Sequence, residues 1–441
     1  MARLEKKAEE AEQTIEDLEL EELLVEDLSE EIPETKKISG KKKMLLAGEI
    51  VVLLLVVVVA VVVLFLRSVW DDMGHGHDYS ATEAGVNSDL PQATVKKLQG
   101  YTNIALFGLD NRGGNDYGSG NSDSIMVASI NNSTKEIRLV SVYRDTFLQV
   151  SEGKYKKANA AYAIGGNSFS VPEDMDEKTA KQERADAAAL QAMWMLNTNL
   201  DLNITQYVCV DWGAVVKTID ALGGIDLEIT EEEVKYINYY LGPTSKGAGV
   251  TSKEVTQSGL VHLDGAQATS YARIRYTRGD DYKRASRQRI VLGKMFELAK
   301  EADLGTLIEI IQSVSSRIST NIDFSTADPY KIDFLSMATN IADYNLASTT
   351  GFPFDLTTKK IPATGDTVIP VSLENNVMKL HQYLFGLSLT EVSETVHSID
   401  QEIVGLTGVS SQSGSIDLSD LNETVGATGT EGLKKEEQEF Q

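Results

Sequence analysis

Apolar and polar positions follow three different patterns along this chain. Residues 44–66 are almost uninterrupted Leu, Val, Ile and Ala, with Glu49 as the only charge. From about residue 96 to residue 386, short apolar runs bounded by Gly, Asn and Ser alternate with stretches of helical periodicity. After Gly386 no aromatic residue occurs until Phe440, and Ser, Thr, Gly and Glu dominate. The pattern predicts an acidic tail over 1–43, a transmembrane helix over 44–66, a polar stalk over 67–95, a folded domain over 96–386 and a disordered tail over 387–441.

The apolar stretch has the length and composition of a membrane span. At about 1.5 Å per helical residue it crosses a hydrocarbon core of about 30 Å, and it lacks the polar face of a helix that packs on a soluble core. Asp71 and Asp72 follow the stretch. The lysines that precede it are Lys36, Lys37, Lys41, Lys42 and Lys43. Because positive charge stays on the cytoplasmic side, we expect a single-pass protein of the cell membrane, with residues 1–43 in the cytoplasm and the folded domain outside.

Within the folded domain, the periodicity predicts strands covered by helices. Apolar runs predict strands over Ile104–Leu109, Ser124–Ile130, Ile137–Tyr143 and Ile225–Ile229. Helical spacing predicts helices over Lys181–Leu196, Trp212–Leu222, Asp264–Tyr271, Ser286–Lys300 and Leu304–Ile318. Strands with helices on both faces form a layered α/β domain.

Charge changes this picture at one place. The chain carries a formal net charge of -25, yet six arginines fall within the nineteen residues from Tyr271 to Arg289. A guanidinium group stays ionised and binds phosphate through paired hydrogen bonds, so the run predicts a phosphate or pyrophosphate ligand. The alternative is a solvated basic patch that Asp280 and Asp281 neutralise. A nucleic-acid partner does not fit an acidic domain outside the cell.

Other common chemistries find little support in the sequence. The single cysteine, Cys209, lies in an apolar run and is predicted to be a buried packing residue. His75 and His77 form a His-Gly-His pair in the predicted stalk, but two histidines alone make a poor metal site. The sequence contains no Gly-x-x-x-x-Gly-Lys-Ser/Thr phosphate loop, no His-Glu-x-x-His zinc motif and no Gly-x-Ser-x-Gly nucleophile motif.

Two aspartates stand at the ends of consecutive predicted strands. Asp110 follows the strand over 104–109, and Asp123 directly precedes the strand that starts at Ser124. If these strands pair, both carboxylates meet at one edge of the sheet, where open α/β sheets bind ligands. Two carboxylates together with phosphate oxygens and waters would suit Mg²⁺. In the alternative interpretation the same aspartates cap the turns of a flexible loop.

Arginines accompany these aspartates at two further points. Arg144 ends a predicted strand beside Asp145, where the pair forms either a structural salt bridge or part of a site. Arg273 and Arg275 are two residues apart, so on extended backbone both side chains would face the same side.

The helix predicted next along the chain continues the basic run. Arg284, Arg287 and Gln288 fall at i, i+3 and i+4 and would share one helix face. They lie near the start of the helix, where backbone N–H groups favour anions. Arg278 and Arg289 are expected to be ordinary surface charge.

The order of these motifs resembles that of the LytR–CpsA–Psr family of cell-wall ligases. The motifs are Asn103-Ile-Ala-Leu-Phe-Gly-Leu-Asp110-x-Arg112, Ser122-Asp123-Ser124, Ser141-Val-Tyr-Arg144-Asp145, Gly223-Gly-Ile-Asp226, and Leu263-Asp-Gly-Ala-Gln-Ala-x-x-Tyr-Ala-Arg273-x-Arg275 leading to Arg284-x-x-Arg287-Gln288-Arg289. The resemblance covers roughly residues 95–385. Tyr143 stands where proline is common in the family, and Lys283 where glycine is common; neither departure removes a charge.

Members of that family are membrane-anchored phosphotransferases of mainly Gram-positive bacteria. The resemblance implies an α/β fold in which a mixed central β-sheet is sandwiched between helix layers (α/β/α), preceded by one transmembrane helix, with a lipid chain in an apolar tunnel. It implies an enzyme that moves a glycopolymer, such as teichoic acid or capsule, from an undecaprenyl-pyrophosphate carrier to peptidoglycan and leaves a phosphodiester.

The resemblance also implies roles for the candidate residues. Asp110 and Asp123 would hold Mg²⁺ and the pyrophosphate, and Arg144 would contact the phosphate that is transferred. The resemblance does not decide the general base, for which the chemistry leaves Asp110 and Asp145 as candidates. The substrate-binding residues would be Arg112, Arg273, Arg275, Arg284 and Gln288.

Two other functions stay open at this point. With water as the acceptor, the same site would be a lipid-pyrophosphate hydrolase. A non-catalytic protein would instead bind the envelope polymer, although every charged position expected for catalysis is present. Phosphoryl transfer requires mainly positioning and neutralisation of charge, which arginines and a metal ion would supply.

Overall fold

The computed structural model describes residues 67–68, 74–110, 117–118, 120–275, 280–328 and 331–416. The transmembrane helix predicted over 44–66 lies outside these residues, as do the acidic tail over 1–43 and residues 417–441. In the part of the chain that is described, no helix combines the length and the apolar character needed to cross a membrane.

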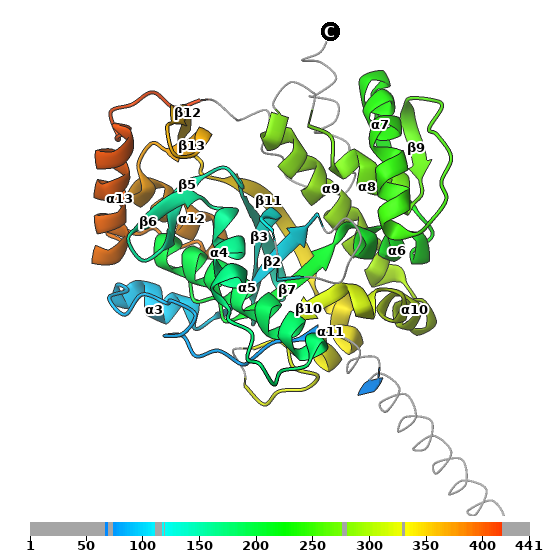
Figure 1. Cartoon of the computed structure of the whole chain (residues 1–441), viewed down its shortest axis with the longest axis horizontal. Helices are drawn as coiled ribbons and strands as arrows, with labels where there is room; N and C mark the ends of the chain where they lie inside the picture. Colours follow the sequence, from blue (N-terminus) through cyan, green and yellow to red (C-terminus); the bar gives the residue numbers. More distant parts are fainter. Residues whose placement is uncertain are drawn as a thin grey trace, which may run out of the picture. The chain divides into compact units, whose positions relative to one another are not determined.

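A seven-stranded mixed sheet forms the centre of the described domain (Figure 1). In spatial order its strands are β1 (Gly74–His75), β10 (Ile318–Thr320), β7 (Gln206–Asp211), β2 (Tyr101–Leu109), β3 (Ser122–Asn131), β4 (Glu136–Val142) and β11 (Asn345–Phe352). β3 pairs antiparallel with both β2 and β4, whereas β2 pairs parallel with β7 and β4 pairs parallel with β11. The first three predicted strands are therefore confirmed as β2, β3 and β4, and the mixed α/β fold class with them.

Helices and three two-stranded sheets surround the central sheet. The helices are α3 (Gln92–Leu98), α4 (Ala160–Ser168), α5 (Glu177–Leu200), α6 (Trp212–Ala221), α7 (Glu231–Ala248), α8 (Gly265–Ala272), α9 (Asp280–Glu301), α10 (Leu304–Val314), α11 (Phe334–Asn340), α12 (Leu373–Phe385) and α13 (Glu394–Thr407). The small sheets pair β5 (Phe147–Ser151) with β6 (Lys154–Lys157), β8 (Ile225–Ile229) with β9 (Gly259–Leu263), and β12 (Leu356–Ile361) with β13 (Gly365–Pro370). The predicted strand over 225–229 and the predicted helices up to residue 271 are confirmed.

Side chains alternate along β2 and so contribute to two separate cores. Phe107 and Leu109 are buried in one hydrophobic cluster with residues of α5, α12 and α13. Ile104 belongs to a cluster on the other face, against which residues of α9, α10 and α11 pack. Helices therefore cover both faces of the sheet. Cys209 of β7 is fully buried, as predicted, and burial raises the pKa of its thiol to about 12.

Two predicted helix boundaries are wrong. The helix expected to start at Ser286 begins at Asp280 and thus includes the acidic residues of the basic run. The helix expected over 304–318 ends at Val314, and after one short 3-10 turn Ile318 enters β10. β10 must be extended because it pairs antiparallel with β7, a partner distant in sequence.

The segment predicted as a polar stalk packs on the domain from Gly74 onward. β1 pairs with β10, and the His77 backbone N–H donates a hydrogen bond to the carboxylate of Asp186 in α5. The hydroxyl groups of Tyr79 and Tyr207 donate to the same carboxylate, and burial raises its pKa above the ordinary value. The stalk prediction is therefore wrong for residues 74–95. The polar composition of this segment could not reveal that its groups bind a buried carboxylate in α5.

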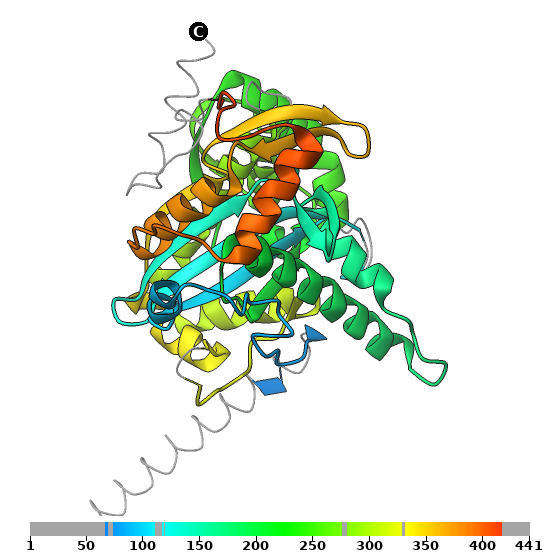
Figure 2. The same ribbon diagram turned by 90° about the vertical axis from the view of Figure 1, so that its left-hand side faces the viewer.

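The tail predicted as disordered contains a packed helix, α13, which contacts α5 and α12 (Figure 2). The side chain of Ser393 caps this helix by accepting a hydrogen bond from the Val396 N–H. Ile399 and Ile403 of α13 are buried in the same cluster as α12. Apolar residues are few in this segment, and its overall composition therefore predicted disorder. A narrow apolar stripe is nevertheless enough to pack one side of a helix against the domain.

A buried ion pair joins α7 to α9. Thr230 and Glu233 form a capping box at the start of α7. Arg287 of α9 donates from Nε to the Glu233 carboxylate at 2.9 Å, and the two side chains are 0% and 2% exposed. The guanidinium group also lies 5.5 Å from the ring centroid of Tyr271 in α8. This pair holds three helices of the α6–α9 region together.

Removing one charge of this pair should destabilise the domain strongly. Arg287→Met leaves the Glu233 carboxylate buried without its cation, so we expect a loss of about 3–5 kcal/mol in the free energy of unfolding. Chemical denaturation of the detergent-purified chain, followed by tryptophan fluorescence, measures this loss. Lys181→Met, which breaks an exposed pair with Glu177, should have no measurable effect. Equal stability of the two variants would contradict the assigned role.

Candidate active site

A polar cavity of about 510 Å³ opens at one end of the central sheet. Its lining residues come from the ends of β2, β3 and β4, from α6 and α7, and from the arginine-rich segment that leads into α9. They are Asp110, Asp123, Arg144, Trp212, Tyr239, Tyr240, Pro243, Arg273, Arg275 and Arg284. Six of these are sequence-predicted site residues.

The register of β2 and β3 brings the two aspartates to the same edge. Leu109 lies opposite Ser122, so Asp110, which follows β2, and Asp123, near the start of β3, stand at the same end of the hairpin. Their side chains are 23% and 17% exposed. The strand pairing on which the prediction of convergence depended is thus present.

Asp123 is held by arginines from two different segments. Arg144, just after β4, donates from Nη1 to Asp123 Oδ1 at 2.7 Å. Arg275 donates from Nη2 to the same oxygen at 3.3 Å, and Arg284 of α9 donates to the Asp123 backbone carbonyl at 3.3 Å. One residue at the sheet edge therefore orients three guanidinium groups around the cavity.

Side chains of α6 and α7 orient Arg273. It donates from Nη1 to the Thr244 hydroxyl at 2.9 Å, and its guanidinium carbon lies 5.6 Å from the Tyr240 ring centroid and 5.8 Å from that of Trp212. Its Nη2 is 3.7 Å from Asp110. The expected extended backbone at this point is wrong: α8 ends here, and Arg273 has helical dihedral angles. Arg273 and Arg275 nevertheless both line the cavity.

Arg284 is the most deeply buried cation of the cavity lining, with its side chain 4% exposed. Burial lowers its pKa to about 10, so it stays charged at neutral pH. Its Nε and Nη1 groups have no hydrogen-bond partner among the described residues. A buried cation with unused donors is a feature that a bound anion would satisfy.

The other members of the predicted helix face have different positions. Gln288 is buried and lines the neighbouring cavities instead of the polar one. Arg287 points away from the site to Glu233, and Arg289, expected on the surface, is 1% exposed. Buried helices distribute side chains around their whole circumference, so i, i+3, i+4 spacing did not identify one functional face. Arg112 and Arg278 lie outside the described residues.

Asp281 belongs to the site, although the sequence predicted for it only the neutralisation of a surface patch of arginines. Its carboxylate lies 3.1 Å from Arg144, 3.3 Å from Arg284 and 3.9 Å from Arg275. Burial would raise its pKa, but Arg284 and Arg144 outweigh burial and lower the pKa below its ordinary value. The spacing of Asp281 and Arg284, one helical turn apart, was the available signal.

Asp145 lies next to this network and not in the polar cavity itself. It contacts Lys157 at 3.1 Å and Arg144 at 3.7 Å. Burial, followed by a hydrogen bond shared with Asp281, raises the pKa of Asp145 above its ordinary value. Asp145 is thus the carboxyl group more ready to carry a proton, and Asp281 the one that stays ionised.

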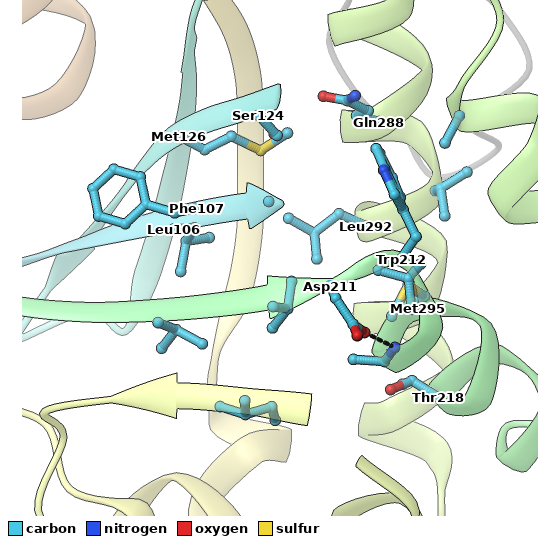
Figure 3. A pocket seen from close by; sticks show the side chains of 18 of the residues that line it. Leu106, Phe107, Ser124, Met126, Asp211, Trp212, Thr218, Gln288, Leu292 and Met295 are labelled. Carbon is cyan, nitrogen blue, oxygen red and sulfur yellow. Dashed lines mark hydrogen bonds between the residues drawn. The ribbon is translucent and has the colours of Figure 1, made fainter. Parts of the chain in front are cut away.

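An apolar cavity of about 230 Å³ adjoins the polar one (Figure 3). It lies between the sheet and α9, with Leu106 and Met126 on one side and Leu292 and Met295 on the other. Trp212 lines both cavities. A cationic chamber therefore stands beside an apolar one, as a ligand with a charged head and an apolar tail would require.

Comparison with known proteins gives consistent matches. The model of the LytR_cpsA_psr family matches residues 74–364. A relative from Enterococcus faecalis, named polyisoprenyl-teichoic acid–peptidoglycan teichoic acid transferase TagU, is 28% identical over 255 residues, which are 57% of this chain and 71% of the relative. Biofilm regulatory protein A of Streptococcus mutans is 27% identical over 256 residues, so that this chain spans only 55% of its length.

Among solved structures, protein gbs0355 of Streptococcus agalactiae is similar with a TM-score of 0.48 and 21% identity, over 69% of this chain and 93% of that one. The family match covers well over half of the 441 residues and includes every candidate site residue described above. This chain belongs to the LytR–CpsA–Psr family.

Proposed function

We propose that this protein is a membrane-anchored phosphotransferase that moves a glycopolymer, of the teichoic acid or capsule type, from a polyprenyl-pyrophosphate carrier to peptidoglycan outside the cell. The observation that carries the proposal is the convergence of four arginines and two aspartates on one cavity beside an apolar cavity. The transferase name of the Enterococcus relative supports the same reaction class.

The reaction forms one phosphorus–oxygen bond and breaks another. The acceptor hydroxyl oxygen bonds to the phosphorus that carries the glycan, the bond from that phosphorus to the bridging oxygen breaks, and the polyprenyl monophosphate leaves. Arg144 neutralises the transferred phosphoryl group, while Arg273, Arg275 and Arg284 neutralise the leaving phosphate. The carrier pyrophosphate supplies the energy, so no nucleotide is required.

A magnesium ion is the proposed cofactor. Asp110 and Asp123 fit it, because both are partly exposed carboxylates on one cavity edge and Mg²⁺ binds through one or two carboxylates plus phosphate oxygens and water. The ion would reduce the charge on the pyrophosphate when bound.

The general base is assigned by position. Of the two carboxylates considered for this role, only Asp110 lines the cavity, so we propose that Asp110 accepts the proton of the acceptor hydroxyl.

Removing either anchor of the arginine network should abolish transfer. We expect Asp123→Ala and Arg144→Ala to reduce kcat/KM by at least about 10³-fold, because each removes charge stabilisation that acts in the transition state. The assay incubates detergent-purified chain with Mg²⁺, a polyprenyl-pyrophosphate-linked glycan and peptidoglycan fragments, and measures labelled peptidoglycan. Asp343→Ala, which changes an exposed aspartate that does not line the cavity, serves as control.

This assay also separates the competing functions. Release of phosphorylated glycan without labelled peptidoglycan would replace the transferase by a hydrolase. Turnover by neither route, with equal lipid binding by wild type and both variants, would leave a polymer-binding protein. Activity that withstands chelation of divalent cations would reject the magnesium proposal alone.

Filling the apolar cavity should affect only donors with long lipid chains. Met295→Trp places a larger side chain in this cavity. If the larger side chain keeps about two methylene groups of the lipid chain out of the cavity, the affinity for the lipid falls about tenfold. The KM for a full-length polyprenyl donor should rise accordingly, while a short-chain donor should be unaffected. Met337→Trp, a change of the same size at a residue 39% exposed on α11, is the control. Equal effects on both donors would contradict a lipid role for the cavity.

The raised pKa of Asp145 predicts a specific dependence of stability on pH. A carboxyl group whose pKa is higher in the folded state stabilises the fold while it is protonated, and this contribution is lost as the pH rises from the ordinary value of 3.8 through the raised one. Asp145→Asn keeps an uncharged partner for Asp281 at every pH. The stability of Asp145→Asn relative to wild type should therefore increase with pH across that window, as measured by denaturation in a pH series. A constant difference would contradict proton sharing.

A further inference from the structure

α7 carries two different faces. Glu233, Ile237, Leu241 and Thr244 are buried against the domain. Tyr236, Tyr239, Tyr240 and Pro243 stand at i, i+3, i+4 and i+7, so three aromatic rings and a proline form an aromatic stripe along another side of the helix. Tyr236 and Tyr240 are partly buried against the core, and Tyr239 and Pro243 are exposed.

The aromatic stripe connects the polar cavity to a second, shallower groove. The groove, of about 390 Å³, is lined by Glu232, Lys235, Tyr236 and Tyr239. Tyr239, Tyr240 and Pro243 line the polar cavity, so Tyr239 belongs to both. Its side chain packs edge to face on Tyr240, at 5.2 Å between ring centroids, and Tyr239 is still 65% exposed. A large exposed ring at the mouth of a cavity is a feature that a ligand would cover.

The chemistry of the groove differs from that of the polar cavity. Its lining contains one lysine and one glutamate, and one further acidic residue, Glu231, is exposed in the same helical turn. A polyanionic chain gains nothing from such a surface, whereas the arginines around the polar cavity favour anions. A sugar ring matches the groove, because its C–H face packs on an aromatic face while its hydroxyl groups meet Lys235 and Glu232.

We propose that the groove along Tyr236 and Tyr239 is the acceptor subsite, which binds the saccharide strand of peptidoglycan and directs one of its hydroxyl groups into the polar cavity. The inference rests on the proposed transferase function and adds the residues that select the acceptor. A sugar stacked on Tyr239 lies at the entrance of the cavity that holds Arg144 and Arg273. The donor enters from the apolar side, and the acceptor enters along α7.

Kinetics with donor and acceptor varied separately test this assignment. In the full chain, Tyr239→Ala should raise the KM for a peptidoglycan oligosaccharide about tenfold, the loss of one stacking contact, with the donor KM unchanged. Tyr239→Phe retains the ring and should remain within about twofold of wild type. Leu406→Ala removes a comparably exposed apolar side chain, 55% exposed on α13, and is the matched control. Thermal unfolding of each variant verifies folding.

Direct binding of the same oligosaccharide, measured by saturation-transfer NMR, keeps the two proposals distinguishable. Wild type should bind it and Tyr239→Ala should bind it more weakly, whether or not transfer is observed. Failure of wild type to transfer, with this binding difference present, would reject the proposed function but not the saccharide subsite. An increased donor KM in Tyr239→Ala would assign the groove to the donor's own sugars and overturn the inference. Equal acceptor KM and equal binding in both proteins would also overturn it.

Discussion

The pairing of Asp123 and Asp281 with Arg144, Arg275 and Arg284 is the interaction on which the site depends. Guanidinium groups that are partly removed from water repel each other and need counter-ions. Asp123 and Asp281 supply them, at distances between 2.7 and 3.9 Å. Arg144 follows β4, whereas Arg275 and Arg284 belong to the arginine-rich segment that leads into α9, so the two carboxylates join the sheet edge to the start of α9. Without them, these cations would not stay close enough to act on one ligand.

The rest of the fold positions these charged side chains around the polar cavity and leaves part of their positive charge without a counter-ion. Four arginines line the polar cavity against Asp110 and Asp123, and Asp281 contacts three of them from the side. Even with all three carboxylates ionised, one positive charge remains in excess. Arg284 still has unused donors among the described contacts. A site preorganised in this way would gain binding energy from an anion without having to rearrange.

The sequence predicted the parts of this arrangement that local pattern determines. Alternating apolar runs identified β2, β3 and β4, and the placement of Asp110 and Asp123 at strand ends followed from those runs. Local pattern failed wherever a distant partner decided the outcome. The burial of Arg287 depends on Glu233, the packing of residues 74–95 depends on Asp186, and α13 depends on the apolar surface of α5 and α12. Apart from α12, none of these partners lies near in sequence, so neither periodicity nor composition contains the information.

The three surfaces around the site differ in polarity, and in the proposed reaction this difference would orient the two substrates. The first cavity is lined mainly by apolar side chains, the polar cavity gathers four arginines, and the groove on α7 combines two tyrosines with one lysine and one glutamate. Trp212 lies at the first boundary and Tyr239 at the second. A donor with a lipid chain and a pyrophosphate matches the two cavities in only one orientation, because reversal would place charge against hydrocarbon. The groove on α7 then stays available for the sugar of the acceptor. In the proposed reaction, Arg144 and Arg273 of the polar cavity would act on the bond to be broken. The contrast in polarity that selects each ligand would therefore also position that bond.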